Sequence, residues 1–501
     1  MGLKGLRNFL FWSLVILYLF LAPSITFHAL GYVFEPKSLS FVKTGIISIH
    51  SEPQNANVFL NGRLFSQKTP VAMTRLIPGR YSLEISSPNY QTWHEDFDVR
   101  GEEVTRAEHI LLVPEKPVFS NQVPSPVHAL VPSAGERFLF LVSHEEGKIL
   151  LNAFDLKKKK LVPLLSESDP DGNHIHALEI VSSRDDRRLI LKLEGKESPI
   201  YISALISEKP EIRNLSEVIS GYISKVRIHP KDSDKIYCLK DKELRVLDLK
   251  EPSVKETILL KDVLDFEAIE DKIYHTTSGG FLFSTDLDGK QKKNLLSDET
   301  LRHRLFEDEK LDLTRMFLTE NENAFWLNQN GTLLTNRLPY FLDENVTGAR
   351  LVGDSKKLVY WKSRELWLLD LTVSEKEESF LERGPNKVLL WKSNRPIMSA
   401  QMMKNGYHAL VSTNEAIFLL DLQGSIPVGR NQFMIEKFHK KNKSKTSFYF
   451  NDDSGDLYLK DFSEDGKASL LRMKLAESSL FSFPFHFRRS YSPPIRIEVN
   501  S

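Results

Sequence analysis

The chain has 501 residues, of which 27% are charged, with 67 basic and 67 acidic side chains. This length predicts at least two folded units, and the balanced charge argues against a dedicated nucleic-acid binder, which needs an excess of Lys and Arg. The single cysteine, Cys238, excludes an intramolecular disulfide and a thiolate metal cluster. Because Cys238 lies in a strand-like run, we expect it to be a small buried residue.

The N-terminus carries a long apolar stretch, residues 8–34, which follows Lys4 and Arg7. It is long enough to cross a bilayer, for which about 20 residues are needed. A cleaved signal peptide is the alternative, but Ala22-Pro-Ser24 is a poor cleavage site because the apolar character resumes after it. Residues 1–35 are therefore predicted to form a short cytoplasmic tail and a transmembrane anchor, with the bulk of the chain outside the cytoplasm by the positive-inside rule.

Short alternating segments between residues 44 and 115 predict a small β-sandwich. Asn61-Gly62 predicts a tight hairpin, because this dipeptide tolerates two positive φ angles. Ile77-Pro-Gly79 predicts a further turn. The predicted strands are 44–50, 57–60, 80–85, 93–99 and 107–113.

The same segment resembles the PEGA domain family. The matching positions are Ser51, Pro53, Ala56, the Val-Phe-Leu-Asn-Gly run at 58–62, Thr69-Pro70, Leu76-x-Pro78-Gly79-x-Tyr81 and Tyr90-x-x-Trp93. The signature tetrapeptide is degenerate here and reads Pro53-Gln-Asn-Ala56. The resemblance implies an exported or surface-associated binding or spacer module, with no catalytic residues to carry over. We interpret Tyr81, Tyr90 and Trp93 as core and turn packing, and an aromatic ligand platform is the alternative.

A proline-rich connector, 116–126, is expected to be an extended and fairly stiff linker. Beyond it an apolar strand ending in Asp-Leu recurs at intervals of roughly 45 residues, the length of a four-stranded propeller blade. The copies end at Asp155-Leu156, Asp248-Leu249, Asp286-Leu287, Asp370-Leu371, Asp421-Leu422 and, more weakly, Asp461-Phe462. The repeat predicts a β-propeller of seven or eight blades over 127–485, followed by a C-terminal tail, 486–501.

The repeated Asp residues have two possible roles. Asp286-x-Asp288-Gly289 and Asp452-Asp453-Ser-Gly-Asp456 look a little like calcium loops, but neither supplies the full set of oxygen ligands in order. We therefore interpret each repeated Asp as an acceptor of backbone hydrogen bonds at a turn that ends a strand.

Other charged residues are interpreted in the same way. His174 and His176 share a strand face without a nearby third ligand, so we expect packed or solvated imidazoles rather than a metal site. The lysine run 157–160 is interpreted as a solvated hairpin tip, and contact with an anionic envelope polymer or lipid headgroups is the alternative.

Two segments depart from the repeat. Asp298 precedes a predicted short helix over 298–311, with Leu301 and Leu305 on one face, and a partner-docking helix is the alternative. The aromatic run 481–487 is interpreted as ring closure or packing across blades, because a terminal strand often completes the other terminus's sheet in a propeller. A partner-binding aromatic patch is the alternative.

The sequence lacks the common hydrolase, metalloprotease and nucleotide-binding motifs. Ser40-x-x-Lys43 and Lys43-Thr44-Gly45 match motifs of penicillin-binding serine enzymes, in which the two motifs lie on separate elements of a large α/β domain. Here they overlap beside a membrane segment, so we treat the match as coincidence. No catalytic, cofactor-binding or metal-binding residues are predicted.

Together these features predict an all-β chain with one N-terminal transmembrane helix, a PEGA-type β-sandwich and a 7–8-bladed β-propeller. This order of parts resembles a recurrent type of membrane protein in bacteria with minimal genomes. We predict a single-pass, membrane-anchored, non-catalytic binding or scaffold protein of the bacterial cell envelope. The expected partners are the membrane and other envelope proteins or cell-wall polymer, with no nucleic acid. A propeller enzyme acting on envelope glycan or peptide, and a sensor or accessory subunit of a membrane complex, are the alternatives.

Overall fold

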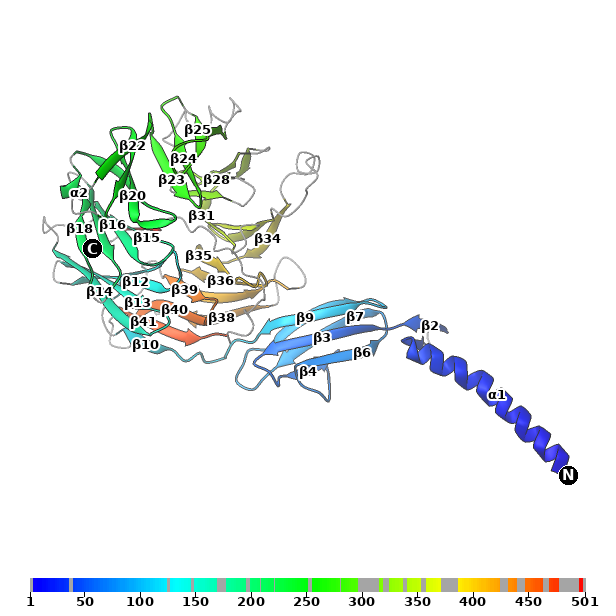
Figure 1. The fold of residues 1–501 in the computed structure, drawn as a ribbon. Coiled ribbons are helices and arrows are strands. Elements are labelled where there is room, and N and C mark those ends of the chain that lie inside the picture. Colours follow the sequence, from blue (N-terminus) through cyan, green and yellow to red (C-terminus); the bar gives the residue numbers. More distant parts are fainter. Residues whose placement is uncertain are drawn as a thin grey trace. The chain divides into compact units, whose positions relative to one another are not determined.

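The computed structural model contains mainly β-strands, with one long apolar helix at the N-terminus (Figure 1). This confirms the predicted all-β class. The structure divides into two units, Met1–Pro117 with Leu419–Ile435 and Val118–Phe418 with Glu436–Ser501. The residues described are 3–35, 39–123, 127–145, 148–168, 177–194, 199–207, 209–219, 221–250, 255–279, 281–295, 315–318, 324–336, 340–352, 357–370, 386–423, 431–438, 447–462, 468–476 and 495–498.

The first unit begins with helix α1, Leu3–Ala29. The stretch Arg7–Phe27 is long and apolar enough to cross a membrane, a property that an anchor shares with a signal sequence. The helix ends at Ala29 rather than continuing through the predicted anchor, 1–35. Gly31 follows with a φ of +80°, a left-handed conformation that commonly terminates helices.

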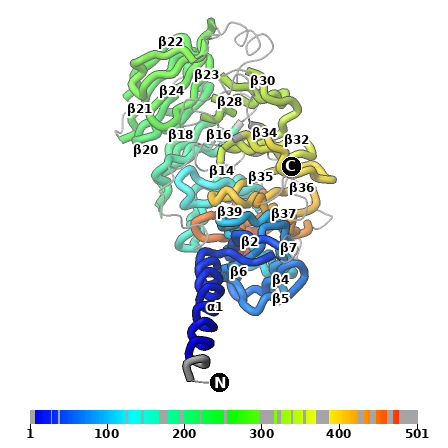
Figure 2. Tube along the Cα trace, turned by 90° about the vertical axis from the view of Figure 1, so that its right-hand side faces the viewer, coloured from blue at the N-terminus to red at the C-terminus, as the bar shows by residue number. Residues whose placement is uncertain are grey.

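A separate two-stranded hairpin follows the helix. Strand β1, Tyr32–Glu35, pairs antiparallel with β2, Ser40–Lys43, and this sheet contains no other strand. Figure 2 shows β2 at the C-terminal end of α1. The last four residues of the predicted anchor are therefore a strand.

Two further sheets of the first unit confirm the predicted sandwich strands and add β5 and β6. One sheet has the order β6-β3-β9 and the other β5-β4-β7-β8. Their strands are β3 (Gly45–Glu52), β4 (Asn57–Leu60), β5 (Arg63–Leu64), β6 (Val71–Leu76), β7 (Gly79–Ser86), β8 (Trp93–Val99) and β9 (Val104–Leu111). Buried Ile47 and Ile49 alternate along β3 as the sequence pattern predicts. Asn61 and Gly62 have φ angles of 50° and 75°, as expected for the predicted hairpin.

From Ser120 onward, the described residues form eight antiparallel sheets (Figure 1). We number these sheets 1 to 8 in chain order. Sheets 1 to 4 contain β11 (Ala129–Pro132), β12 (Phe138–Glu145), β13 (Lys148–Asp155), β14 (Lys160–Ser168); β15 (Ala177–Ser182), β16 (Arg188–Glu194), β17 (Pro199–Leu205), β18 (Ile212–Asn214); β19 (Ile223–His229), β20 (Asp232–Lys240), β21 (Glu243–Asp248), β22 (Lys255–Lys261); β23 (Asp265–Ile269), β24 (Lys272–Thr276), β25 (Leu282–Asp286) and β26 (Lys293–Asn294). A short helix, α2 (Leu215–Val218), follows β18.

Sheets 5 to 8 repeat the same antiparallel meander. They contain β27 (Met316–Leu318), β28 (Ala324–Leu327), β29 (Leu333–Thr335), β30 (Phe341–Asp343); β31 (Val346–Leu351), β32 (Lys357–Lys362), β33 (Glu365–Asp370), β34 (Asn386–Lys392); β35 (Ile397–Met402), β36 (His408–Thr413), β37 (Ala416–Asp421), β38 (Gln432–Lys437); β39 (Phe448–Asn451), β40 (Asp456–Phe462) and β41 (Ala468–Lys474). The strands named for each sheet pair in chain order, because short turns favour pairing between successive antiparallel strands.

Apolar cores join each sheet to the next. Buried side chains are shared between sheets 1 and 2, 2 and 3, 3 and 4, 4 and 5, and 5 and 6. Strands β32 and β35 join sheets 6 and 7, and the Gln401 side chain bonds to the Phe450 backbone in sheet 8. A further core, with Leu139 from sheet 1 and Tyr458 from sheet 8, joins the last sheet to the first. Each sheet therefore contacts the next in chain order, and sheets 8 and 1 also share a core.

Strand β10, Ser120–Val123, completes sheet 8 by pairing with β41, in the order β10-β41-β40-β39. It interrupts the linker predicted over 116–126. The sequence of β10, Ser-Asn-Gln-Val, has no apolar alternation, so the pattern did not indicate a strand. Similarly, β42 (Ile495–Glu498) lies in the predicted tail and adds a fifth strand to sheet 2 beside β15.

Candidate functional site

The repeated Asp residues lie where strands end in turns. Asp155 Oδ1 accepts hydrogen bonds from the backbone N–H groups of Lys157 and Lys158 at 3.0 and 2.9 Å. Asp248 and Asp286 each accept one from the turn that follows, and Asp421 accepts one from Gln423. The prediction of turn-stabilising aspartates is confirmed for these four copies.

The lysine run 157–160 forms the turn between β13 and β14 and is exposed as predicted, but one member also pairs with the neighbouring sheet. Lys159 Nζ lies 3.1 Å from Asp456 Oδ2 and contacts the Tyr458 hydroxyl. Burial lowers the pKa of Lys159, against the opposing effect of Asp456. A positive φ of 55° at Lys159 turns the chain so that this ammonium points toward sheet 8. Lys157 and Lys158 are exposed, as predicted.

Loops between the first and second strands interlock neighbouring sheets. Asp186, in sheet 2, accepts hydrogen bonds from the backbone N–H groups of Gly135 at 2.9 Å and Arg137 at 3.0 Å, in sheet 1. A Cβ atom at Gly135 would lie 2.2 Å from Asp186 Oδ2, so only glycine fits there. Asp452, in sheet 8, similarly accepts a bond from the Lys404 N–H, in sheet 7, at 2.7 Å.

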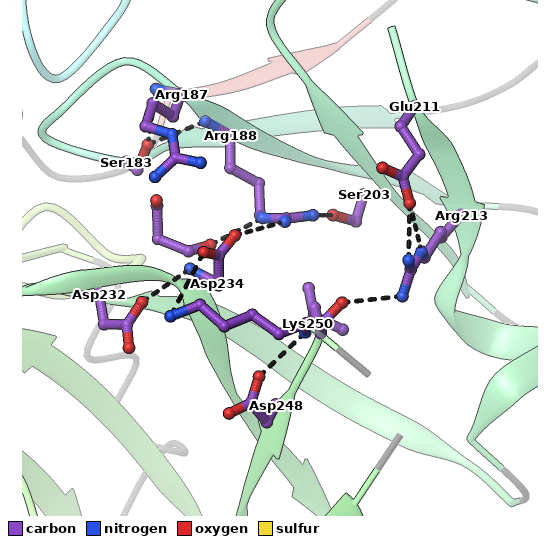
Figure 3. Close-up of polar contacts among 12 residues, drawn as sticks. Ser183, Arg187, Arg188, Ser203, Glu211, Arg213, Asp232, Asp234, Asp248 and Lys250 are labelled. Carbon is purple, nitrogen blue, oxygen red and sulfur yellow. Dashed lines mark hydrogen bonds and ion pairs between the residues drawn. The ribbon is translucent and has the colours of Figure 1, made fainter. Parts of the chain in front are cut away.

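A buried arginine makes the equivalent connection between sheets 2 and 3 (Figure 3). Arg188 donates to the Ser233 carbonyl at 2.7 Å, to Ser203 Oγ at 3.0 Å and to Asp234 Oδ1 at 2.9 Å. Nearby, Arg213 donates to the Leu249 carbonyl at 2.9 Å. The Arg188 fork is satisfied by groups of the protein itself, so this cluster is explained as a connection between sheets.

A second charged cluster comes from the first strands of sheets 2, 3 and 4. Arg227 Nε lies 2.8 Å from Glu267 Oε1, and Arg227 Nη2 lies 3.0 Å from Glu179 Oε1. Lys225 Nζ lies 2.8 Å from Asp265 Oδ1 and 3.4 Å from Glu267 Oε2. These five side chains are largely withdrawn from water, and each cation contacts two carboxylates, the kind of pairing that buried charges require.

A third cluster surrounds Lys404. Its Nζ lies 2.7 Å from Glu136 Oε2 and 3.4 Å from Asp453 Oδ1. Burial raises the pKa of Asp452 to about 7, and Glu136 acts in the same direction against the opposing effect of Lys404. Of the clusters described, this one alone contains a carboxyl that titrates near neutral pH.

Residues singled out for possible reactivity are inert in their surroundings. Cys238 is fully buried on β20, as predicted, and burial raises the pKa of its thiol to about 12, so no nucleophilic thiolate forms near neutral pH. Ser40 and Lys43 lie three residues apart on β2 and so point to opposite faces of the strand. Lys43 instead contacts Glu102. Among the described residues, no group of three or more His, Cys, Asp or Glu side chains is arranged to hold a metal ion.

The residues that carry the PEGA resemblance meet in the sandwich. Ser51 Oγ lies 2.6 Å from Thr69 Oγ1 and donates to the Pro53 carbonyl at 2.9 Å. Thr69 Oγ1 also accepts a hydrogen bond from the Ala56 N–H at 3.0 Å. Since Ser51 and Thr69 are buried, these bonds satisfy groups that water cannot reach. These positions therefore fix the loop between β3 and β4.

The three aromatic residues of this segment follow the packing interpretation. Tyr81 donates its hydroxyl proton to the Ile77 carbonyl at 2.8 Å across the predicted turn. Trp93 is fully buried, and its indole Nε1 donates to Asp421 Oδ2 at 2.5 Å within the first unit. Tyr90 forms a bridge with Pro114. No aromatic platform for a ligand results from these contacts.

Sequence patterns missed the paired charges, although a signal was present. Lys225-x-Arg227 and Asp265-x-Glu267 each place two like charges on one strand face. The sequence alone does not show that these strands are neighbours. His174, His176, the predicted helix 298–311 and the aromatic run 481–487 lie outside the described residues.

Comparisons with known proteins give a match to one family and similarities to solved structures. No curated protein matches the chain. Among solved structures, the chain is similar to the β-propeller domain of Cps50 (Swd1) from Myceliophteria thermophila, with 11% identity, a TM-score of 0.36, and coverage of 72% of this chain and 100% of that one. Residues 44–111 match the PEGA domain, which confirms the resemblance read from the sequence.

Proposed function

We propose that this protein is a single-pass, membrane-anchored binding or scaffold protein of the bacterial cell envelope, without catalytic activity of its own. Its eight sheets are the blades of a β-propeller, and α1 anchors the chain with the N-terminus in the cytoplasm. The observation that carries this proposal is the order of parts, an apolar helix, a PEGA-matching sandwich and a series of eight antiparallel sheets. Such a series offers a rigid repeated surface, which suits binding.

The pairing of buried charges supports the non-catalytic part. A general acid or base must exchange protons with a substrate, whereas Glu267 and Glu179 are engaged by Arg227. We expect the partners to be other envelope proteins or cell-wall polymer.

A second candidate function rests on Asp452. A carboxyl with a pKa raised to about 7 is suited to act as a general acid, which favours an enzyme acting on envelope glycan or peptide. Against this, Asp452 is buried and already accepts a bond from the Lys404 backbone.

Labelling in intact bacterial cells tests the topology. A Val118→Cys variant places a thiol at an exposed position, whereas the native Cys238 is buried and stays silent. We expect a membrane-impermeant maleimide to label Val118→Cys before lysis and a Lys4→Cys control only after lysis. Labelling of Val118→Cys only after lysis would place the bulk of the chain inside and contradict the proposal.

Crosslinking in the same cells tests the binding role. We expect the full-length chain to enrich an envelope protein or wall polymer that a chain lacking residues 1–35 does not recover. Cleavage of wall polymer by the purified chain, lost in Asp452→Asn, would instead favour the enzyme.

A further inference from the structure

The hairpin β1–β2 presents an aromatic face next to the end of α1. Phe34 pairs with Phe41 and Tyr32 pairs with Lys43 across the hairpin. Because paired and alternate residues of a hairpin share a face, these four side chains lie on the same side. We call Tyr32, Phe34, Phe41 and Lys43 the hairpin face.

Phe27 of α1 connects this face to the apolar helix. Its ring stacks on Phe41 with a centroid distance of 5.1 Å and meets Tyr32 edge-on at 5.6 Å. Phe34 in turn meets Phe41 at 5.4 Å. Phe27 is also the last residue of the stretch with the length and composition of a membrane span. The apolar surface of the helix therefore continues onto the hairpin without a break.

Backbone contacts hold the hairpin at this position. Gly31 turns the chain after the helix, and its carbonyl accepts the Thr44 N–H at 3.0 Å and the Thr44 hydroxyl at 2.9 Å. These bonds join the two ends of the hairpin close to the C-terminal end of α1. The aromatic cluster is thus fixed within a few residues of the helix end.

The hairpin face is poorly covered by protein. Phe34 is 46% exposed, Phe41 54% and the neighbouring Leu39 78%. A lone two-stranded hairpin is marginally stable in water, and clustered exposed aromatic side chains mark an interaction surface. These observations imply that another surface covers the hairpin in its working environment.

We propose that the hairpin face docks on the headgroup region of the bilayer that α1 crosses, on the side away from the N-terminus. This inference rests on the proposed anchoring. The Tyr32 ring, with its polar hydroxyl, favours the boundary between hydrocarbon and water, and apolar rings such as Phe34 and Phe41 bury into the headgroup region beside it. Helix α1 extends only two residues beyond Phe27, about 3 Å at the rise of an α-helix, so the hairpin lies at that boundary. Lys43, which lies 5.4 Å from the Tyr32 ring centre, is held at the same level.

Docking of this kind restricts how the sandwich can move. A single helix followed by a loose connector would let the exported part swivel freely. A docked hairpin adds a second point of contact with the membrane and fixes the start of β3 close to the lipid surface.

Spin labels on the full-length chain in vesicles of phosphatidylcholine and phosphatidylglycerol test this inference. Labels are placed at Phe34→Cys and Leu39→Cys on the hairpin, at Phe20→Cys within α1, and at Leu64→Cys, an exposed aliphatic position on β5. Collisions with oxygen, which concentrates in lipid, are compared with collisions with a water-soluble nickel chelate. For each label we take the ratio of its collision rate with oxygen to its collision rate with the nickel chelate. We expect this ratio to be at least threefold higher at positions 34 and 39 than at position 64.

Three results would overturn the inference in distinguishable ways. If the labels at 34 and 39 have the same oxygen and nickel accessibility as the label at 64, while the label at 20 lies in lipid, the hairpin does not dock but α1 still anchors the chain. Shielding of 34 and 39 from both reagents would mean that a protein, such as a second copy of the chain, covers the hairpin. If the label at 20 is also in water, both the anchoring and the docking fail.

A paired variant checks that the aromatic rings cause the docking. We expect Phe34→Ser with Phe41→Ser to bring the label at 39 to the accessibility of the label at 64. Val104→Ser, at an exposed aliphatic position of the same unit, is the matched control and should leave the label at 39 in place. An unchanged label in the double variant would show that the rings do not hold the hairpin on lipid.

Discussion

Glu267 is the carboxylate that both cations of the buried charged cluster share. Its side chain is 1% exposed and meets both Arg227 and Lys225. A buried cation that loses its partner keeps the full cost of leaving water. The stability of the second unit should therefore depend on this carboxylate much more than on ion pairs at the surface.

Replacement of Glu267 by Ala tests this dependence. We expect the free energy of unfolding to fall by about 1.5–3 kcal/mol, because Arg227 and Lys225 each lose one buried charged partner and keep Glu179 and Asp265. Urea denaturation of the full-length chain in detergent measures the change. Glu211→Ala removes the more exposed partner of Arg213 and should cost less than about 1 kcal/mol. Equal effects of the two substitutions would show that the buried cluster contributes nothing special.

Asp452 links the stability of the protein to pH. Its pKa is raised from 3.8 to about 7, so the folded chain binds the proton more tightly than the unfolded chain. The stabilising contribution is fully present below the unfolded pKa and is lost as the pH rises through about 7. The protein should therefore lose stability from this group between about pH 4 and about pH 7.

An Asp452→Asn variant removes the titrating proton. We expect its melting temperature to change less between pH 5 and pH 8 than that of the unaltered chain. Burial also raises the pKa of Asp421 to about 7, so Asp421 should account for part of the remaining pH dependence. Asp453→Asn, next to it and largely exposed, is the control and should keep the original dependence. An unaltered pH dependence in Asp452→Asn would refute the assignment of this carboxyl.

At the scale of elements, β10 decides whether sheet 8 is complete. Val123, the last residue of β10, is buried in the core shared by sheets 8 and 1. The rest of the strand is polar, and Asn121 is exposed. One apolar residue therefore holds this strand against both sheets.

A pair of aspartate substitutions separates core contact from strand pairing. Val123→Asp puts an unpaired charge in the core and should lower the free energy of unfolding by about 3 kcal/mol or more. Asn121→Asp, two residues away, should stay within about 0.5 kcal/mol. Urea unfolding of both variants measures this difference. A mild effect of Val123→Asp would mean that β10 is not part of the shared core.

Alternation of apolar residues predicted those elements that bury one face. It found β3, β4, β7, β8 and β9, whose inward residues are apolar. It missed β10, whose sequence has no apolar alternation, and β42, whose Ile495 and Ile497 do alternate but lie in a segment predicted as a tail. It also missed β6, where Val71 and Met73 do alternate.

For the whole molecule, the repeat predicted the number of sheets but not the contacts between them. The Asp-Leu copies recur because each of those tested ends a strand in a similar turn, and their spacing of roughly 45 residues, rather than their number, predicted seven or eight sheets. The contacts of Arg227 with Glu267 and of Lys404 with Glu136 join residues far apart in the chain. Such pairs depend on which strands become neighbours, which a single sequence does not state. The envelope location and the binding role stay predictions.

The completion of sheet 8 by β10 has a consequence for how the protein is made. Ser120 on β10 contacts Arg472 on β41 across 352 positions of the chain. The ribosome therefore produces β10 long before β41, and β10 stays unpaired until β41 has been made. A mostly polar strand such as Ser-Asn-Gln-Val can stay unpaired in water without aggregating. Contacts between residues so far apart in the chain form late in folding. We therefore expect the pairing of β10 with β41 to be the last and slowest folding step, after nearly the whole chain has been made.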